Sequence, residues 1–328
     1  LPTREKAEKP TIYIAGDSTA QTYNYTKVYP QTGWGQVFAD YFNDDIIIEN
    51  RAMGGRSSKS YDNDGRLDRI LTEMHPGDYV FIQFGINDGA ENKPERYISV
   101  EDYKKLITDK YIGEVEKRGG TPVLMTANAA AWWDEENNCF MESRKDYADP
   151  TREIAEETGC KFIDENKIVT DAWNSMSKNR VLSGYFICEP LESKAYPSGT
   201  NDTTHMKAKG AKRVAKLIAD AIPENVPELA KYLKGDETFT DIQGHWAEDV
   251  IKTLAENDKV SGVGDGKFNP DGTVTRAEFL KMAMDSLGIV GHAYRDGECL
   301  DATNDDWYCY YLQGALDKDI IPEEMIED

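Results

Sequence analysis

The sequence predicts an α/β protein with two domains, a three-layer α/β/α sandwich followed by a smaller, mostly α-helical domain. Short apolar runs alternate with longer segments of helical period before residue 222. Residues 236–328 hold 7 basic and 22 acidic residues, so this segment carries −15 of the formal net charge of −22 and leaves −7 for the remainder. Prolines and a glycine in 222–235 interrupt a helical pattern. We therefore expect an N-terminal tail at 1–10, a first domain at 11–235 and a second domain at 236–328.

Apolar runs in the first domain are typical of buried strands, and the segments between them are typical of helices. The expected strands are Thr11–Ala15, Ile46–Glu49, Tyr79–Phe84, Pro122–Thr126 and Lys161–Ile163. The expected helices are Trp34–Phe42, Arg66–Met74, Val100–Lys117, Arg144–Thr158 and Met206–Ile222. Because strands and helices alternate, the strands should form a parallel sheet covered on both faces, a flavodoxin-like arrangement. Ligands of such sheets bind beyond the carboxyl ends of the strands, so we expect chemistry there.

The composition excludes several classes of function. The 328 residues are 39% hydrophobic and 30% charged, which indicates a globular protein. With 38 basic and 60 acidic residues the surface repels phosphate backbones, so we expect no nucleic-acid partner. Apolar runs are far shorter than the ~18 residues that span a bilayer, so we expect no membrane span. The chain begins at Leu1, which suggests a leader removed upstream. Five cysteines without a CxxC pair argue against a dense disulfide framework but leave one or two bridges open.

Four polar clusters lie at the expected ligand-binding edge. They are Gly16-Asp17-Ser18-Thr19, Gly54-Gly55-Arg56-Ser57, Gly85-Ile86-Asn87-Asp88 and Asp202-Thr203-Thr204-His205. Acyl transfer by serine needs a hydroxyl, an imidazole, a carboxylate and donors for the oxyanion. We therefore expect Ser18 as nucleophile, His205 as general base and Asp202 as the group that fixes the imidazole tautomer. The expected oxyanion hole comprises the backbone N–H groups of Ser18 and Gly55 and the side-chain amide of Asn87.

Plainer interpretations exist for each of these features. Gly-Asp-Ser after a strand is by itself more often a turn with a helix cap, and His205 could simply begin a helix. We interpret His75, His245 and His292 as surface or packing residues. No HxH, HxxH or CxxC pair is present, so a catalytic metal is not expected. Segment 264–271 has the composition of a calcium loop, but its ligands are out of register, which favours a polar turn.

Aromatic and basic residues near the clusters are candidates for binding substrate. Trp34, Trp132, Trp133 and Tyr196 could stack on sugar rings, although a core position is the commoner outcome for tryptophan. Arg56 could bind a uronate carboxylate or simply pair with an acidic residue. The segments that flank the site are polar, unlike the walls of an acyl-chain pocket, which favours a carbohydrate ester over a lipid.

The four clusters in this order resemble the blocks of the SGNH or GDSL hydrolase superfamily, which centre on Ser, Gly, Asn and His. Here Ser18, Gly55, Asn87 and His205 match, and the resemblance extends over residues 11–222. Within the superfamily, the sequences GDSTA, GRS, FGIND and YP before DTTH are most similar to the rhamnogalacturonan acetylesterase group. The resemblance implies a cofactor-free enzyme that releases acetate from plant cell-wall polysaccharide.

The resemblance leaves the polymer open. Pectic rhamnogalacturonan is the first expected substrate and acetylxylan the second, and another esterase or lipase activity of the superfamily is a further alternative. Residues Ala127–Ala131 depart from relatives, which carry bulkier or basic side chains after the fourth strand. A hypothesis of another class is a surface protein that binds cell wall and whose hydrolase-like domain is inactive.

The second domain contains a self-similar period of ~50 to 60 residues. The segment from Phe239 to Leu287 is echoed by Tyr294-Arg295-Asp296 and by Trp307–Ile321. Its Trp246 and Thr-Arg-Ala-Glu segment resemble an S-layer homology module, of which one repeat is complete and a second is partial. The resemblance implies docking on cell-wall polysaccharide at a bacterial cell surface, with Trp246 and Arg276 as glycan contacts. Alternatively, Trp246 only anchors the helix pair and Arg276 only forms a cap or an ion pair.

Overall fold

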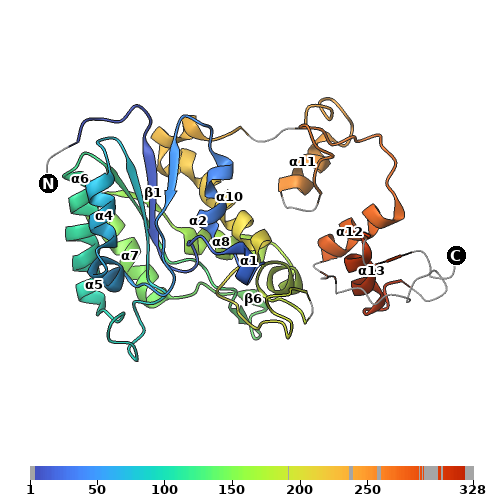
Figure 1. Ribbon diagram of the computed structural model, residues 1–328, viewed down its shortest axis with the longest axis horizontal. Coiled ribbons are helices and arrows are strands. Elements are labelled where there is room, and N and C mark those ends of the chain that lie inside the picture. Colours follow the sequence, from blue (N-terminus) through green and yellow to red (C-terminus); the bar gives the residue numbers. More distant parts are fainter. Residues whose placement is uncertain are drawn as a thin grey trace. The chain divides into compact units, whose positions relative to one another are not determined.

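Figure 1 shows the computed structural model, which forms two compact units. One unit comprises Leu1–Met176 and Asp202–Leu233, and the other comprises Ser177–Asn201 and Lys234–Asp328. The second unit thus includes a segment that the sequence analysis assigned to the first domain. The structure describes residues 4–190, 192–235, 239–256, 260–287, 289, 291, 302–303 and 306–321.

A parallel sheet lies at the centre of the first unit. Its strands are β1 (Thr11–Gly16), β2 (Ile47–Asn50), β3 (Tyr79–Gln83), β4 (Thr121–Met125) and β7 (Lys161–Ile163). They follow the order β2-β1-β3-β4-β7, and every pairing is parallel. This order is that of a doubly wound, flavodoxin-like sheet, so the predicted fold class is confirmed.

Helices cover both faces of this sheet (Figure 1). On one face Tyr13 and Ala15 of β1 join a core that includes residues of α3 (Ser58–Asn63), α4 (Arg66–Glu73), α5 (Val100–Leu106) and α7 (Lys145–Thr158). The opposite face is covered by α10 (Ala208–Asn225) and by two helices that contact it, α2 (Trp34–Val37) and α8 (Glu165–Asn174). All six residues of β1 are buried, because a parallel sheet between two helical layers has no solvent face.

Two segments that were expected to be continuous α-helices are π-helical or 3-10 helical over part of their length. The segment expected as one helix over Val100–Lys117 is α5, then a π-helical stretch η2 (Ile107–Ile112), then α6 (Gly113–Glu116). The wider turn buries the adjacent residues Tyr111 and Ile112 together, an outcome that apolar spacing alone does not reveal. Trp34–Phe42 begins as α2 and continues as the 3-10 helix η1 (Phe38–Tyr41).

Several short elements have no counterpart among the expected ones. Besides α3 and α8, they are α1 (Tyr25–Val28), β5 (Trp133–Asp134), β6 (Cys139–Phe140), α9 (Lys178–Val181), η3 (Leu182–Phe186) and η4 (Pro227–Tyr232). None of the helices in the described residues is long and apolar enough to span a membrane.

The second unit has a small core of its own. Ile242, Ala247 and Ile251 are buried there and pack with Phe239 and Phe268. Its longer helices are α11 (Glu248–Glu256), α12 (Arg276–Leu287) and α13 (Cys309–Leu316). Residues 264–267 form a tight turn closed by backbone hydrogen bonds, as expected for a polar turn. The expected echo Tyr294-Arg295-Asp296 lies outside the described residues, as does His292.

Candidate active site

The structure brings Ser18, His205 and Asp202 into one hydrogen-bonded chain. Ser18 follows the carboxyl end of β1, and the other two residues lie in the loop before α10. The distance from Ser18 Oγ to His205 Nε2 is 2.8 Å, and that from His205 Nδ1 to Asp202 Oδ2 is 2.6 Å. These contacts join residues 187 positions apart in the sequence. The arrangement is that of a nucleophile, a general base and an orienting carboxylate.

The environment of Asp202 keeps its carboxylate ionised. Burial raises the pKa of this carboxyl, but the hydrogen bonds from His205 and from two backbone N–H groups outweigh burial and lower the pKa to about 2. Oδ1 accepts the backbone N–H groups of Thr204 at 2.8 Å and of His205 at 3.0 Å, which leaves Oδ2 for the imidazole. The hydrogen bond to Asp202 raises the pKa of His205, although burial opposes the rise. The Nδ1 proton thus points at the carboxylate, and Nε2 is left to accept a proton from Ser18.

Donors for an oxyanion lie at the ends of neighbouring loops. Gly55 has φ +72°, a conformation that glycine adopts without strain. Within the described part of the chain, the backbone N–H groups of Ser18 and Gly55 donate to no protein acceptor. One N–H of the Asn87 amide donates to the carbonyl of Arg56 at 3.0 Å, so its second N–H is available for a ligand.

A buried carboxylate ties these two loops together. Asp88 Oδ1 accepts the backbone N–H of Ser58 at 2.9 Å and its hydroxyl at 2.5 Å, and Oδ2 accepts the backbone N–H of Gly85 at 2.9 Å. Burial raises the pKa of Asp88 to about 6, against the lowering effect of these hydrogen bonds. The bonds connect the loop after β2, which holds Gly55, to the loop after β3, which holds Asn87. Asp88 therefore links the two segments that hold the expected oxyanion donors.

Arg96 is a residue of this site that the sequence analysis missed. Its Nη1 donates to Asn87 Oδ1 at 3.4 Å, and its Nη2 lies 3.2 Å from the position that a Cβ on Gly55 would occupy. The Asn87 oxygen is therefore directed at the guanidinium, which turns the amide nitrogen to the other side. No motif in the sequence identifies Arg96, because its contacts depend on how the loop 89–99 folds back over the sheet edge.

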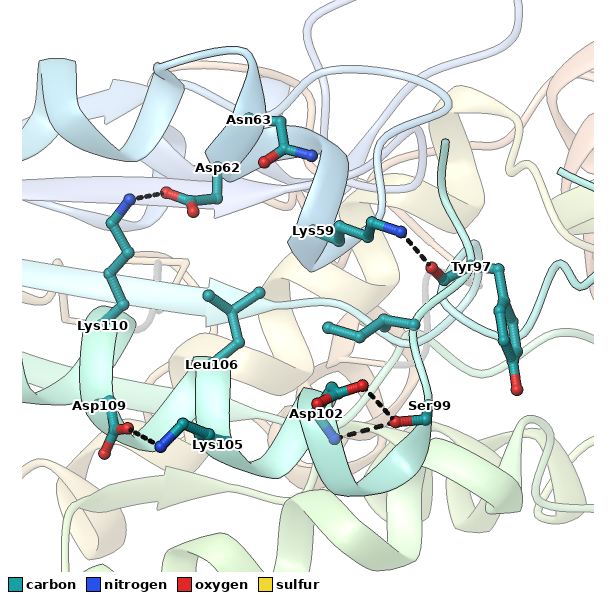
Figure 2. Close-up of a pocket in the computed structure, with 11 residues that line it drawn as sticks. Lys59, Asp62, Asn63, Tyr97, Ser99, Asp102, Lys105, Leu106, Asp109 and Lys110 are labelled. Carbon is teal, nitrogen blue, oxygen red and sulfur yellow. Dashed lines mark hydrogen bonds and ion pairs between the residues drawn. The ribbon is translucent and has the colours of Figure 1, made fainter. Parts of the chain in front are cut away.

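Lys59 holds the loop that carries Arg96. Its Nζ donates to the carbonyls of Pro94 at 3.1 Å and Tyr97 at 3.0 Å. Figure 2 shows Lys59 and Tyr97 on the wall of a cavity of about 530 Å³ between α3 and α5. The charged residues of this cavity are largely paired with one another, as in Lys110 with Asp62. The triad residues do not line this cavity, so we assign it a role in holding the loop rather than in the chemistry.

Trp34 is not a sugar platform, contrary to the expectation from the sequence. Its side chain is 0% exposed, and its Nε1 donates to Gln83 Oε1 at 2.8 Å. Its ring packs edge-on against Phe38, 5.2 Å away. The position is part of the core beneath the sheet edge, and a sugar has no access to it. The prediction of a substrate contact at Trp34 is therefore wrong.

The other predicted substrate residues have different surroundings. Trp132 is half-buried, and the N–H of the preceding Ala131 donates to the carbonyl of Thr203 at 2.8 Å, which joins this loop to the loop of the triad. Trp133 packs against Phe140 in the β5–β6 hairpin. Tyr196 belongs to the second unit. Substrate contacts by these three aromatic residues stay predictions.

Arg56 pairs with an acidic residue, which is the second of its two expected roles. Its Nε donates to Asp64 Oδ2 at 3.0 Å, and its Nη1 donates to the carbonyl of Gly54 at 3.0 Å. The hydrogen bond from Arg56 is the main cause that lowers the pKa of Asp64. Arg56 is thus an ion-paired residue that stabilises the turn at Gly54 and Gly55.

Comparison with known proteins places this geometry in a family. Residues 14–213 match the GDSL-like Lipase/Acylhydrolase family. The chain belongs to this family. It is 36% identical over 213 residues to "Probable rhamnogalacturonan acetylesterase YesY" of Bacillus subtilis, a match that covers 65% of this chain and 92% of that protein. It is 32% identical over 216 residues to "Rhamnogalacturonan acetylesterase RhgT" of the same organism, covering 65% and 89%.

A solved structure supports the assignment of the fold. The crystal structure of the protein YXIM of Bacillus subtilis superposes with a TM-score of 0.54 at 29% identity, covering 68% of this chain and 56% of that chain. The fold and the family match together identify the chain as an ester hydrolase of the GDSL-like family.

The second unit has matches of its own. Residues 238–280 match the S-layer homology domain. The chain is 44% identical over 89 residues to "Exoglucanase XynX" of Acetivibrio thermocellus, which is 27% of this chain but 8% of that protein. Trp246 is 88% exposed, so it does not anchor the helix pair, and Arg276 is exposed as well. Glycan contacts by these two residues stay predictions.

Proposed function

We propose that this chain removes O-acetyl groups from rhamnogalacturonan through an acetyl-enzyme intermediate on Ser18. The observation that carries the proposal is the hydrogen-bonded chain from Ser18 through His205 to Asp202, at the same sheet edge as the donors of Gly55 and Asn87. The choice of polymer is supported by the names of the two Bacillus subtilis relatives, whose length the chain covers almost completely.

The proposed reaction follows from the positions of these groups. Ser18 Oγ attacks the acetyl carbon while His205 Nε2 takes the hydroxyl proton, and the carbonyl oxygen becomes an oxyanion. The N–H groups of Ser18 and Gly55 and the amide of Asn87 donate to this oxyanion. His205 then gives its proton to the departing sugar hydroxyl. A water molecule, deprotonated by His205, attacks acetyl-Ser18, and the resulting intermediate collapses to acetate and free Ser18 with return of the proton.

The test of the chemistry is Ser18→Ala. We expect this variant to release acetate from acetylated rhamnogalacturonan at least about 1000-fold more slowly than the parent enzyme, because no covalent intermediate can form. Ser175→Ala is the matched control, since that hydroxyl only donates to the carbonyl of Ala172 at the end of α8. Acetate release by Ser18→Ala at the parental rate would exclude Ser18 as the nucleophile. A parent enzyme that releases acetate from acetylxylan but not from acetylated rhamnogalacturonan would exclude the proposed polymer.

We further propose that the S-layer homology domain holds the enzyme at a bacterial cell surface by binding cell-wall polysaccharide. The exposed Trp246 supports a contact with a sugar face, and the exposed Arg276 supports a contact with an acidic group. Sedimentation of the protein with purified cell walls tests this proposal. We expect Trp246→Ala to leave more protein in the supernatant with unchanged esterase activity. Equal sedimentation of the variant and the parent would exclude Trp246 as a wall contact.

A further inference from the structure

Arg144 has an unusual backbone conformation at the start of α7. It is the N-cap residue of this helix, with φ +55° and ψ +35°, which is the left-handed region. Arginine adopts this region rarely, and such conformations concentrate at functional sites. The conformation is unexplained by a capping bond, because the Arg144 side chain makes none to the helix.

The Arg144 guanidinium lacks a carboxylate partner among the described residues. In the described residues it forms no ion pair, and its buried Nε has no hydrogen-bond partner. The contact recorded for the side chain is with the Trp132 ring, whose centroid lies 4.9 Å from Cζ. Arg152, on the same helix, instead pairs with Glu142, Asp149 and Asp164. The terminal nitrogens of Arg144 donate no hydrogen bond within the described part of the chain, so an acceptor from a ligand would complete their hydrogen bonds.

The first turn of α7 lies against the loop that carries Asn87. A Cβ on Gly85 would lie 3.1 Å from the Cβ of Tyr147, and a Cβ on Gly89 would lie 3.1 Å from Asp146 Oδ2. The Tyr147 hydroxyl also donates to the carbonyl of Asp88 at 3.2 Å. The start of the helix is therefore part of the edge at which the oxyanion donors lie.

The Arg144 side chain is also connected to the loop of the triad through its stacking partner. Its stacking partner Trp132 follows Ala131, which is hydrogen-bonded to Thr203 in the loop of Asp202 and His205. Burial raises the pKa of Asp17, the neighbour of Ser18, and among the opposing effects are the hydrogen bonds from Thr19 and the positive charges of His205 and Arg144.

We propose that Arg144 and Trp132 form a subsite that binds the carboxylate of a uronic acid in the substrate. A guanidinium stacked on an indole keeps its N–H groups in the plane free, and these match the two oxygens of a carboxylate. The inference rests on the proposed function, because rhamnogalacturonan supplies galacturonate residues whereas a neutral xylan backbone does not. Arg56 and Arg96 suit this role less well, since the first pairs with Asp64 and the second donates to Asn87.

The experiment measures each of three enzymes on each of two substrates. The enzymes are the parent, Arg144→Gln and the control Lys145→Gln, which removes one positive charge from an exposed neighbouring position. The substrates are acetylated rhamnogalacturonan oligosaccharides as free acids and the same oligosaccharides with methyl-esterified carboxyl groups. We expect Arg144→Gln to raise KM for the free acids about tenfold and to leave KM for the methyl esters unchanged. Lys145→Gln should change neither value.

The parent enzyme alone provides a second test of the subsite, which needs no variant. Its KM should be about tenfold higher for the methyl esters than for the free acids, and added salt should reduce this difference. Arg144→Asn is a second variant, because asparagine tolerates the left-handed conformation, and it should reproduce the result of Arg144→Gln. Equal losses on both substrates in a folded variant, or a parent enzyme indifferent to esterification, would overturn the subsite. A parent enzyme inactive on both substrates would instead overturn the proposed function.

Discussion

Replacing Asp202 with Asn should inactivate the enzyme by imposing the wrong tautomer on His205. In the structure, Oδ1 of Asp202 accepts two backbone N–H groups, at 2.8 and 3.0 Å. An asparagine must place its oxygen at these donors, so its NH₂ group faces His205 Nδ1 at the position where Oδ2 now lies, 2.6 Å away. Nδ1 then has to accept, the proton moves to Nε2, and Nε2 can no longer take a proton from Ser18.

We expect a loss of about 10,000-fold in kcat, the effect typical of this substitution in serine hydrolases with the same arrangement, which corresponds to about 5.5 kcal/mol. The assay is hydrolysis of p-nitrophenyl acetate at saturating substrate. Asp220→Asn is the control, because that carboxylate is exposed on α10 and pairs with Lys216. Both variants should unfold at the temperature of the parent within a few degrees. A folded Asp202→Asn enzyme with kcat within tenfold of the parent would refute the reasoning about the tautomer.

Three further predictions concern the general base His205, the oxyanion hole and the buried Asp88 that links its two loops. The hydrogen bond that His205 donates to Asp202 raises the pKa of His205, and only the neutral imidazole accepts the proton from Ser18. On the acid side, kcat/KM should therefore fall tenfold per pH unit with a midpoint above 6.5, and a midpoint below 6 would contradict this. Asn87→Ala should lower kcat about 100- to 1000-fold with little change in KM, and an equal rise in KM would argue against a role in the transition state. Ser58→Ala removes a hydrogen bond to buried Asp88 and raises the pKa of that carboxyl further above about 6. Measured by urea denaturation, the free energy of unfolding of Ser58→Ala should be about 1.5 to 3 kcal/mol lower than that of the parent. This decrease should be larger at pH 8 than at pH 5, and equal decreases would exclude an ionised Asp88 in the folded protein.

Much of the fold could be predicted from the sequence, because each central strand is a continuous apolar run. The strand at Lys161–Ile163 has the expected bounds, and the others differ by one residue at one or both ends. The type of helix was harder to predict from the sequence, since the spacing of apolar residues in Val100–Lys117 fits an α-helix and a π-helical stretch almost equally well. The segment Ser177–Asn201 shows a further limit: its sequence gives no sign that it belongs to the second compact unit.

Some residues of the site could also be predicted from the sequence, and others could not. Ser18, Asp202 and His205 follow sequence patterns because Ser18 lies just after β1 and the other two lie in the loop that leads into α10. The topology brings these two segments to one edge. Trp34 shows the opposite case, since spacing places it near that edge and only packing reveals that its ring points into the core. Arg96 and Arg144 were inaccessible because their contacts depend on irregular loops and, for Arg144, on a left-handed backbone that no local pattern requires.

Covalent labelling tests the central claim, an activated Ser18, most directly. The protein is treated with a fluorophosphonate, which reacts with serine only where a neighbouring base removes the proton, and the site of the adduct is determined by peptide mass spectrometry. We predict one adduct per chain, on Ser18, and at least about 100-fold slower labelling in His205→Ala. An unlabelled Ser18 in the folded parent protein, or labelling at the same rate without the imidazole, would contradict the account.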